Sequence, residues 1–141
     1  MNKLPIYFGY AGILPFAFFT VIIVFGGDKA HTIGLLQIAY AAMILSFLGG
    51  VHWGQAIPSN NRKQISFAML PTIISLALFV LYAMQFYFIA LIGTAIMFWV
   101  TFEADKKLMP VEHIPPGYFR FRAVLTYVVM ALLTISAFAV L

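Results

Sequence analysis

The fold of this chain is decided by the stretch QISFAMLPTIISLALFVLYAMQFYFIALIGTAIMFWVTF, which runs from Gln64 to Phe102. It contains 39 residues and no Asp, Glu, Lys, Arg or His. One membrane crossing needs about 20 apolar residues, so the stretch is too long for one helix and suits two. We expect the break at Tyr82–Gln85, because Gln85 is the only strongly polar side chain near its midpoint.

Three further uncharged runs have the length of a membrane span. They cover residues 4–27, 32–51 and 123–141, which are 24, 20 and 19 residues long. Together with the two halves of the long stretch, they predict an all-α integral membrane bundle of five transmembrane helices in a single domain over residues 1–141. The expected spans are about 5–25, 32–56, 65–83, 86–102 and 121–140.

The composition excludes several other classes of protein. Hydrophobic residues make up 64% of the chain and charged residues 9%, whereas soluble domains have about 45–50% and about 25%. The chain has no cysteine, which excludes disulfides, thiolate metal sites and a cysteine nucleophile. Its net charge of +4 is not accompanied by a nucleic-acid-binding motif, so no nucleic acid partner is expected.

The basic residues indicate how the five spans are oriented. One side of the membrane would receive seven of them, namely Lys3, Arg62, Lys63, Lys106, Lys107, Arg120 and Arg122. The other side would receive only Lys29. Because cytoplasmic segments are enriched in Lys and Arg, this pattern predicts a cytoplasmic N-terminus and a C-terminus outside.

Small residues and prolines suggest how the helices pack. The second span carries a seam of small residues spaced four apart: Ala42, Ser46, Gly50 and Gly54. Such seams let helices approach closely in lipid, which makes this span the expected centre of the bundle. The glycines either pack helices or let a ligand or another backbone come close. Pro15 and Pro71 lie inside spans and should kink them, which would open a vestibule towards the cytoplasm.

Polar chemistry is concentrated in the string LGGVHWG, residues 48–54, near the cytoplasmic end of the second span. An ionisable side chain near membrane depth suggests a functional site. His52 could bind a metal, a haem or a quinone, or carry a proton. Alternatively, it only bonds a neighbouring helix, lies in the headgroup zone or faces water. Trp53 is either an interfacial residue or a platform for a ligand.

The segment 103–122 is expected to be the one sizeable loop, and it contains Glu103 and Asp105. Arg120 and Arg122 begin the fifth span and are two residues apart, so at most one should face the bundle. They either snorkel to headgroups, pair with one of these acids, or bind an anionic headgroup. No metal site is predicted, since the histidines are scattered and no H-E-x-x-H motif exists. No cofactor is assigned.

Three strings in this order resemble a known family. They are GYAGILPF at Gly9–Phe16, YAAMILSFLGGVHWG at Tyr40–Gly54 and YFRFRAVLT at Tyr118–Thr126. The chain resembles the domain-of-unknown-function family of small bacterial inner-membrane proteins that also includes mitochondrial transmembrane protein 69. The resemblance covers nearly the whole chain and implies a multi-pass protein of the bacterial inner (cytoplasmic) membrane. It brings no established reaction, substrate or cofactor.

The leading hypothesis is a binding or accessory protein that holds a lipid, a quinone-like molecule or a membrane partner at a cytoplasm-facing site. The expected ligand-binding residues are His52, Trp53, Tyr10, Gly50, Gly54, Arg120, Arg122, Glu103 and Asp105. One alternative is a small transporter or proton pathway, which needs ionisable groups at mid-membrane. Another is an enzyme acting on lipid or quinone, which the sequence does not favour. The last is an assembly factor or homo-oligomer, whose glycine seam would be exposed.

Overall fold

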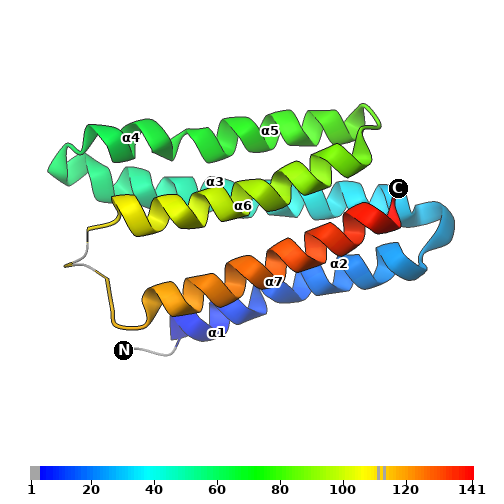
Figure 1. The fold of residues 1–141 in the computed structure, drawn as a ribbon, viewed down its shortest axis with the longest axis horizontal. Helices are drawn as coiled ribbons and strands as arrows, with labels where there is room; N and C mark the ends of the chain where they lie inside the picture. The colour runs from blue at the N-terminus through cyan, green and yellow to red at the C-terminus, as the bar shows by residue number, and fades with distance from the viewer. Residues whose placement is uncertain (1–3, 111, 113) are drawn as a thin grey trace.

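The computed structural model describes residues 4–110, 112 and 114–141, and there the chain forms a bundle of helices (Figure 1). The first span consists of α1 (Leu4–Ala11) and α2 (Ile13–Phe25), and the short 3-10 turn η1 (Gly27–Lys29) leads into α3 (Ala30–Ser59). The third span consists of α4 (Arg62–Ala68) and α5 (Leu70–Ala83), and it is followed by α6 (Tyr87–Leu108) and α7 (Tyr118–Ala139). Five helical segments are long and apolar enough to cross a membrane, which confirms the predicted five-helix bundle.

The two central helices are α3 and α6. In Figure 1 they lie between α4–α5 on one side and α1, α2 and α7 on the other. The predicted centre, α3, packs against α2, α4, α5 and α6. The helix α6 is also central. In its 18-residue apolar segment 44% of the residues are buried inside the bundle, compared with 33% in the corresponding segment of α3.

The two prolines break the first and third spans at corresponding points. Pro15 comes four residues after Ala11, which is the last residue of α1, and Pro71 comes four residues after Phe67 in α4. A proline lacks the N–H that would bond the carbonyl four residues earlier, and its ring clashes with that carbonyl. The helices therefore stop and restart at Gly12 and Met69.

The long uncharged stretch turns where the sequence predicted. The helix α5 ends at Ala83 and α6 begins at Tyr87. Between them Gln85 has a φ of 74°, a left-handed conformation that few residues other than glycine adopt. A polar, exposed side chain at this point is solvated at the end of the bundle, which favours a turn over a continuous helix.

The largest difference from the predicted boundaries lies at the end of the fourth span. The predicted loop began at Glu103, but α6 continues to Leu108, two residues before Pro110. The added turns are stabilised at the surface by an ion pair in which Lys106 Nζ lies 2.9 Å from a carboxylate oxygen of Glu103. The extension carries Asp105 into the bundle, where its side chain is completely buried.

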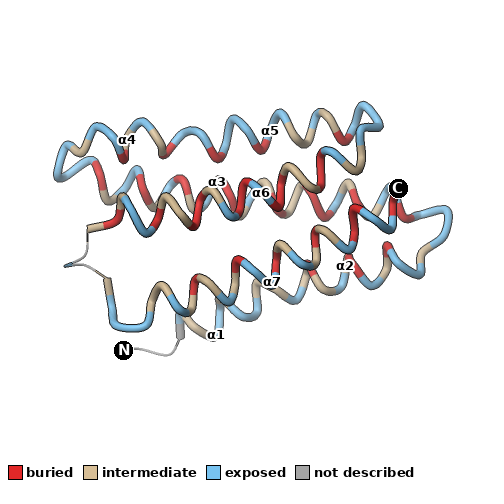
Figure 2. The backbone as a smooth tube through the Cα atoms, viewed as in Figure 1, coloured by how far each residue is buried: buried red, intermediate tan, exposed pale blue. Residues whose placement is uncertain are grey.

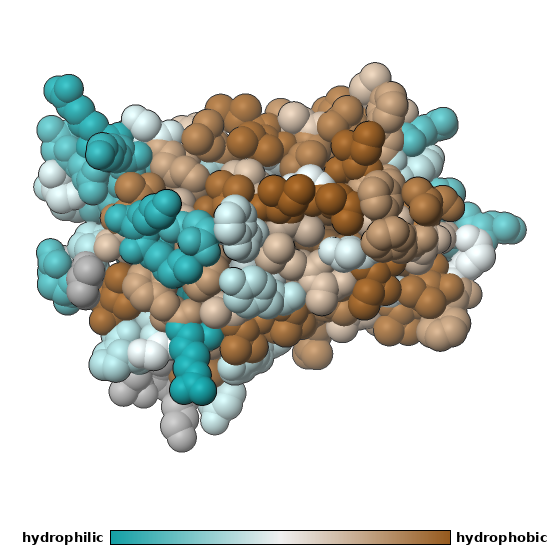
Figure 3. Space-filling view, viewed as in Figure 1, coloured by the Kyte–Doolittle hydropathy of each residue, from teal (hydrophilic) through white to brown (hydrophobic). Residues whose placement is uncertain are grey.

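The surface of the bundle is apolar along its length and polar at its ends. Buried residues face inward along every long helix (Figure 2), and hydrophilic side chains gather at one end of the space-filling view (Figure 3). We call this end the basic end, because it carries the exposed Arg62, Lys63, Lys106, Lys107 and Arg120. The opposite end carries Asp28 and Lys29.

A small cluster of buried polar residues lies between α2, α3 and α7, near the middle of the bundle. The Gln37 amide nitrogen donates to the Phe16 carbonyl at 3.1 Å and to Thr20 Oγ1 at 2.8 Å. The Thr20 hydroxyl lies 2.9 Å from that of Ser136. Side-chain hydrogen bonds between helices contribute up to about 1–2 kcal/mol each in a membrane protein, so this cluster fixes how the three helices meet.

Candidate functional site

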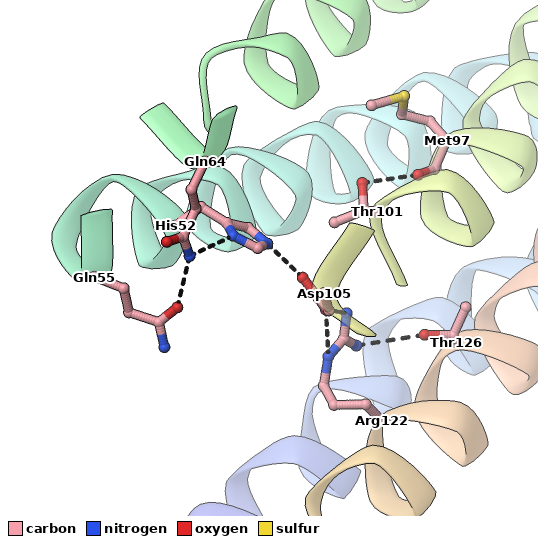
Figure 4. A network of polar contacts seen from close by, with 8 residues as sticks. All are labelled: His52, Gln55, Gln64, Met97, Thr101, Asp105, Arg122 and Thr126. Atoms are coloured by element: carbon pink, nitrogen blue, oxygen red, sulfur yellow. Dashed lines mark hydrogen bonds and ion pairs between the residues drawn. The ribbon is translucent and has the colours of Figure 1, made fainter. Parts of the chain in front are cut away.

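A buried ion-pair network joins α3, α6 and α7 near the basic end (Figure 4). Asp105 lies at its centre. Its Oδ1 accepts a hydrogen bond from His52 Nε2 at 2.6 Å, and its Oδ2 accepts from Arg122 Nη2 at 2.7 Å and Nε at 3.2 Å. His52 and Asp105 are fully buried, and Arg122 is 7% exposed.

The other ring nitrogen of His52 is held by a glutamine pair. The Gln64 amide nitrogen donates to His52 Nδ1 at 2.9 Å and to Gln55 Oε1 at 2.9 Å. With the Gln64 amide in this orientation, its N–H donates and Nδ1 accepts, which corresponds to the neutral Nε2–H tautomer of His52. Gln64 Oε1 is buried and has no partner in the described part of the chain.

A close backbone contact brings Gln64 to the histidine. A Cβ at Gly49 would collide with the carbonyl oxygen of Ala68. Glycine therefore lets α4 lie directly on α3, and Asn61 begins α4 by accepting a hydrogen bond from the Gln64 backbone N–H at 3.3 Å. These two features set the Gln64 side chain against His52.

The guanidinium of Arg122 also makes a hydrogen bond outside the ion pair. Besides its two bonds to Asp105, its Nη1 donates to Thr126 Oγ1 at 3.4 Å, one turn further along α7. Three of its five N–H groups make these bonds, and the Tyr118 side chain is a further hydrogen-bonding neighbour of Arg122. The charges of Asp105 and Arg122 cancel, so the cluster is neutral as a whole when His52 is neutral.

Arg122 and Thr126 also line a cavity of about 500 Å³. The cavity lies between α1–α2, α3, α6 and α7, and nearly all of its wall is apolar. Two lining residues, Phe8 and Phe47, are 67% and 68% exposed, so its mouth lies on the apolar flank of the bundle. Its lining on α7 ends at Val129, halfway along the helix.

The structure brings together three of the residues predicted for the site: His52, Asp105 and Arg122. Arg120 points to the exposed side, so only one of the two arginines faces the bundle, as predicted. Arg122 does not snorkel but pairs with an acid. Glu103 lies outside the network and pairs with Lys106.

The remaining predicted residues lie away from the network. Trp53 and Tyr10 are both 43% exposed, and the Tyr10 ring packs edge-on against Phe121 at 5.4 Å. Gly50 and Gly54 are exposed and face open space. The predicted small-residue seam therefore does not face the interior of the bundle; the buried glycine beside it is Gly49.

Three members of the network were not predicted. Thr126 had a usable signal, because it follows Arg122 by four residues and so shares its helix face. Gln64 and Gln55 had none, because a polar residue at a membrane edge is usually solvated. Their role depends on a contact between α3 and α4 that is set by Gly49.

Five apolar helices around a buried charged network define a polytopic helical membrane protein. The chain belongs to the family described as "Protein of unknown function (DUF3429)", which matches residues 1–138.

Two proteins named "Transmembrane protein 69" are similar to parts of the chain. The one from Xenopus tropicalis is 44% identical over 59 residues, which are 42% of this chain and 23% of the relative. The one from Mus musculus is 30% identical over 77 residues, which are 55% of this chain and 31% of the relative. The chain thus aligns with less than a third of either relative. No solved structure matches it.

Proposed function

We propose that this protein binds an amphipathic molecule, a lipid or a quinone-like compound, inside the membrane. The observation that carries the proposal is the apolar cavity with Arg122 on its wall. The apolar part of the ligand would occupy the cavity. Its polar group would accept a hydrogen bond from Arg122, which has five N–H groups and uses three of them on Asp105 and Thr126.

The size and polarity of the cavity suit such a ligand. Its volume of about 500 Å³ falls within the roughly 300–1,000 Å³ of small-molecule sites, which are mostly apolar with a few polar groups that fix orientation. Here those groups are Tyr118, Arg122 and Thr126. A mouth between Phe8 and Phe47 would let a ligand enter from the bilayer.

We also propose that the basic end faces the cytoplasm of a bacterial cell, with the chain in the inner membrane. The support is the segregation of the basic residues to one end of the bundle. The binding site would then lie in the cytoplasmic half of the membrane, where His52 was expected.

Two other functions receive less support. An enzyme acting on the ligand would need a titratable base at the cavity wall, but His52 does not line the cavity. A transporter would need a path across the bundle. The cavity extends only about halfway along the bundle. Beyond it the interior contains Phe16 and the small polar cluster around Gln37.

A specific observation keeps a membrane partner as a second candidate. Gly50 and Gly54 present open space on the exposed face of α3, and exposed small residues are where transmembrane helices associate. Cysteine cross-linking at Gly50 in membranes would test this candidate, because the chain has no cysteine of its own. A cross-linked species would support a partner helix or a second copy.

Filling the cavity tests the proposed function. Leu125→Trp would place a large ring in the cavity, whereas Leu76→Trp makes the same change on α5 at a side chain that is 62% exposed. Native mass spectrometry of protein released from membranes should show a bound small molecule in the wild type and in Leu76→Trp, and a loss in Leu125→Trp. Equal retention in both variants, or a bare wild-type chain, would contradict the proposal.

A further inference from the structure

The inference concerns the kind of ligand and rests on the proposed function. We propose that the cavity takes an amphiphile with one anionic group, and that its binding is accompanied by uptake of a proton at His52. The ligand itself would touch Arg122. His52 would act through Asp105 as a residue that matches the charge of the site to that of the ligand.

The charges of the buried cluster balance when the Gln64 amide donates to His52. In that arrangement His52 is neutral, and the charges of Arg122 (+1) and Asp105 (−1) cancel. A ligand anion at Arg122 would leave the buried cluster at −1, and an unpaired charge in an apolar interior is costly. One proton on His52 returns the total to zero, so the ligand anion and the proton stabilise each other.

The proton would bind to Nδ1 of His52. His52 Nε2 already donates to Asp105, so the free position is Nδ1, which now accepts from the Gln64 amide. Turning the Gln64 amide by half a rotation exchanges its nitrogen and oxygen. The oxygen that is now buried without a partner would then accept a hydrogen bond from the protonated Nδ1.

The rest of the network can follow this rotation. Gln55 now accepts from Gln64, and its own amide would turn to donate instead. Gln55 is half-buried near the basic end, so it can exchange partners with water. Protonation thus keeps the hydrogen bond at each ring nitrogen, and solvent water at the basic end supplies the proton.

The surroundings of His52 support this response. The charged groups facing it are Asp105 from α6 and, beyond that acid, Arg122 from α7. The helix α4 contributes the Gln64 amide and the Phe67 ring, whose centroid lies 5.3 Å from that of the imidazole, while its charged residues Arg62 and Lys63 are exposed. Apart from Asp105, which already accepts hydrogen bonds from His52 and Arg122, none of these neighbouring groups is a base.

Calorimetry with two probes of equal chain length tests the inference. Hexadecanesulfonate stays anionic at all accessible pH values, and hexadecanol is its neutral counterpart. Titrating the full chain in dodecyl maltoside with each probe, in buffers of different ionisation enthalpy, gives the number of protons taken up per ligand. We expect close to one for the sulfonate at pH 8 and none for the alcohol. Sulfonate affinity should fall by up to about tenfold for each unit of rising pH. Palmitate and hexadecyl phosphate would then distinguish a carboxylate from a phosphate as the preferred anion.

Two controls keep the test independent of folding defects. His52→Gln should bind the sulfonate without proton uptake and without its pH dependence. In the wild type, nitrogen NMR of labelled histidine should show His52 changing from the Nε2–H tautomer to the imidazolium when the sulfonate is added, which needs no variant.

The outcomes separate this inference from the proposed function. Sulfonate binding with a neutral His52 and no proton uptake would overturn the coupling and leave the cavity as a ligand site. Hexadecanol binding as tightly as the sulfonate would overturn the anionic class. Failure of every probe to bind, together with a bare chain in native mass spectrometry, would overturn both.

Discussion

Replacing Asp105 by Asn should destabilise the bundle far more than its single lost charge suggests. The change removes the acceptor that pairs with both His52 and Arg122. Asn can still accept one hydrogen bond, but it cannot neutralise the guanidinium. Arg122 would therefore remain buried, at 7% exposure, without a counter-charge.

The size of the destabilisation follows from the cost of leaving one partner of a buried ion pair without its counter-charge. Such changes typically cost about 3–5 kcal/mol. Because Arg122 borders the cavity and Asn keeps one hydrogen bond, we expect the lower end, about 3 kcal/mol. For a chain of this length that corresponds to a fall in Tm of roughly 10 °C.

Thermal unfolding in detergent, followed by the fluorescence of the two tryptophans, measures this change. The matched control is Glu103→Gln, the same kind of substitution on the same helix in an exposed ion pair with Lys106, which should cost less than about 1 kcal/mol. Adding Arg122→Gln to Asp105→Asn removes the unpaired charge and should recover about 2 kcal/mol relative to the sum of the two single changes. Equal effects of Asp105→Asn and Glu103→Gln, or strict additivity in the double variant, would refute this account of the network.

Two further predictions follow from the packing and the orientation. Gly49→Ala should destabilise the protein by about 1–3 kcal/mol, because its Cβ would collide with the carbonyl of Ala68. Gly50→Ala, which faces open space, should be neutral or stabilising by up to about 1 kcal/mol, and comparing the two denaturation midpoints checks both. In intact cells, a membrane-impermeant maleimide should label Met84→Cys but not Lys107→Cys, and the reverse result would show that the basic end faces outward.

The spans could be predicted from the sequence because two simple constraints govern them. A crossing needs about 20 apolar residues, and charged side chains are avoided inside it. The second constraint also explains the boundary with the largest error. It ended the fourth span before Glu103, although Asp105 is tolerated in the bundle because Arg122 neutralises it.

The partners within the site could not be predicted in the same way. Asp105 meets His52 across 53 positions of sequence and Arg122 across 17. Periodicity showed that only one of the two arginines faces inward, but not which one. It also could not predict how α3 is rotated about its own axis, which determines that Gly49 is buried and Gly50 exposed. These details depend on contacts between helices, which a single sequence does not specify.

The position of the charged network says more about ligand binding than about stability. A buried ion pair is costly to break, yet replacing both partners by apolar residues of similar volume is often neutral or stabilising. A bundle of this size could therefore fold without one. Here the arginine of the pair lines an apolar cavity. Asp105 bonds this arginine and is itself bonded by His52, so the network holds Arg122 in place beside the cavity, which suits a site that must orient a polar group at the end of an apolar molecule.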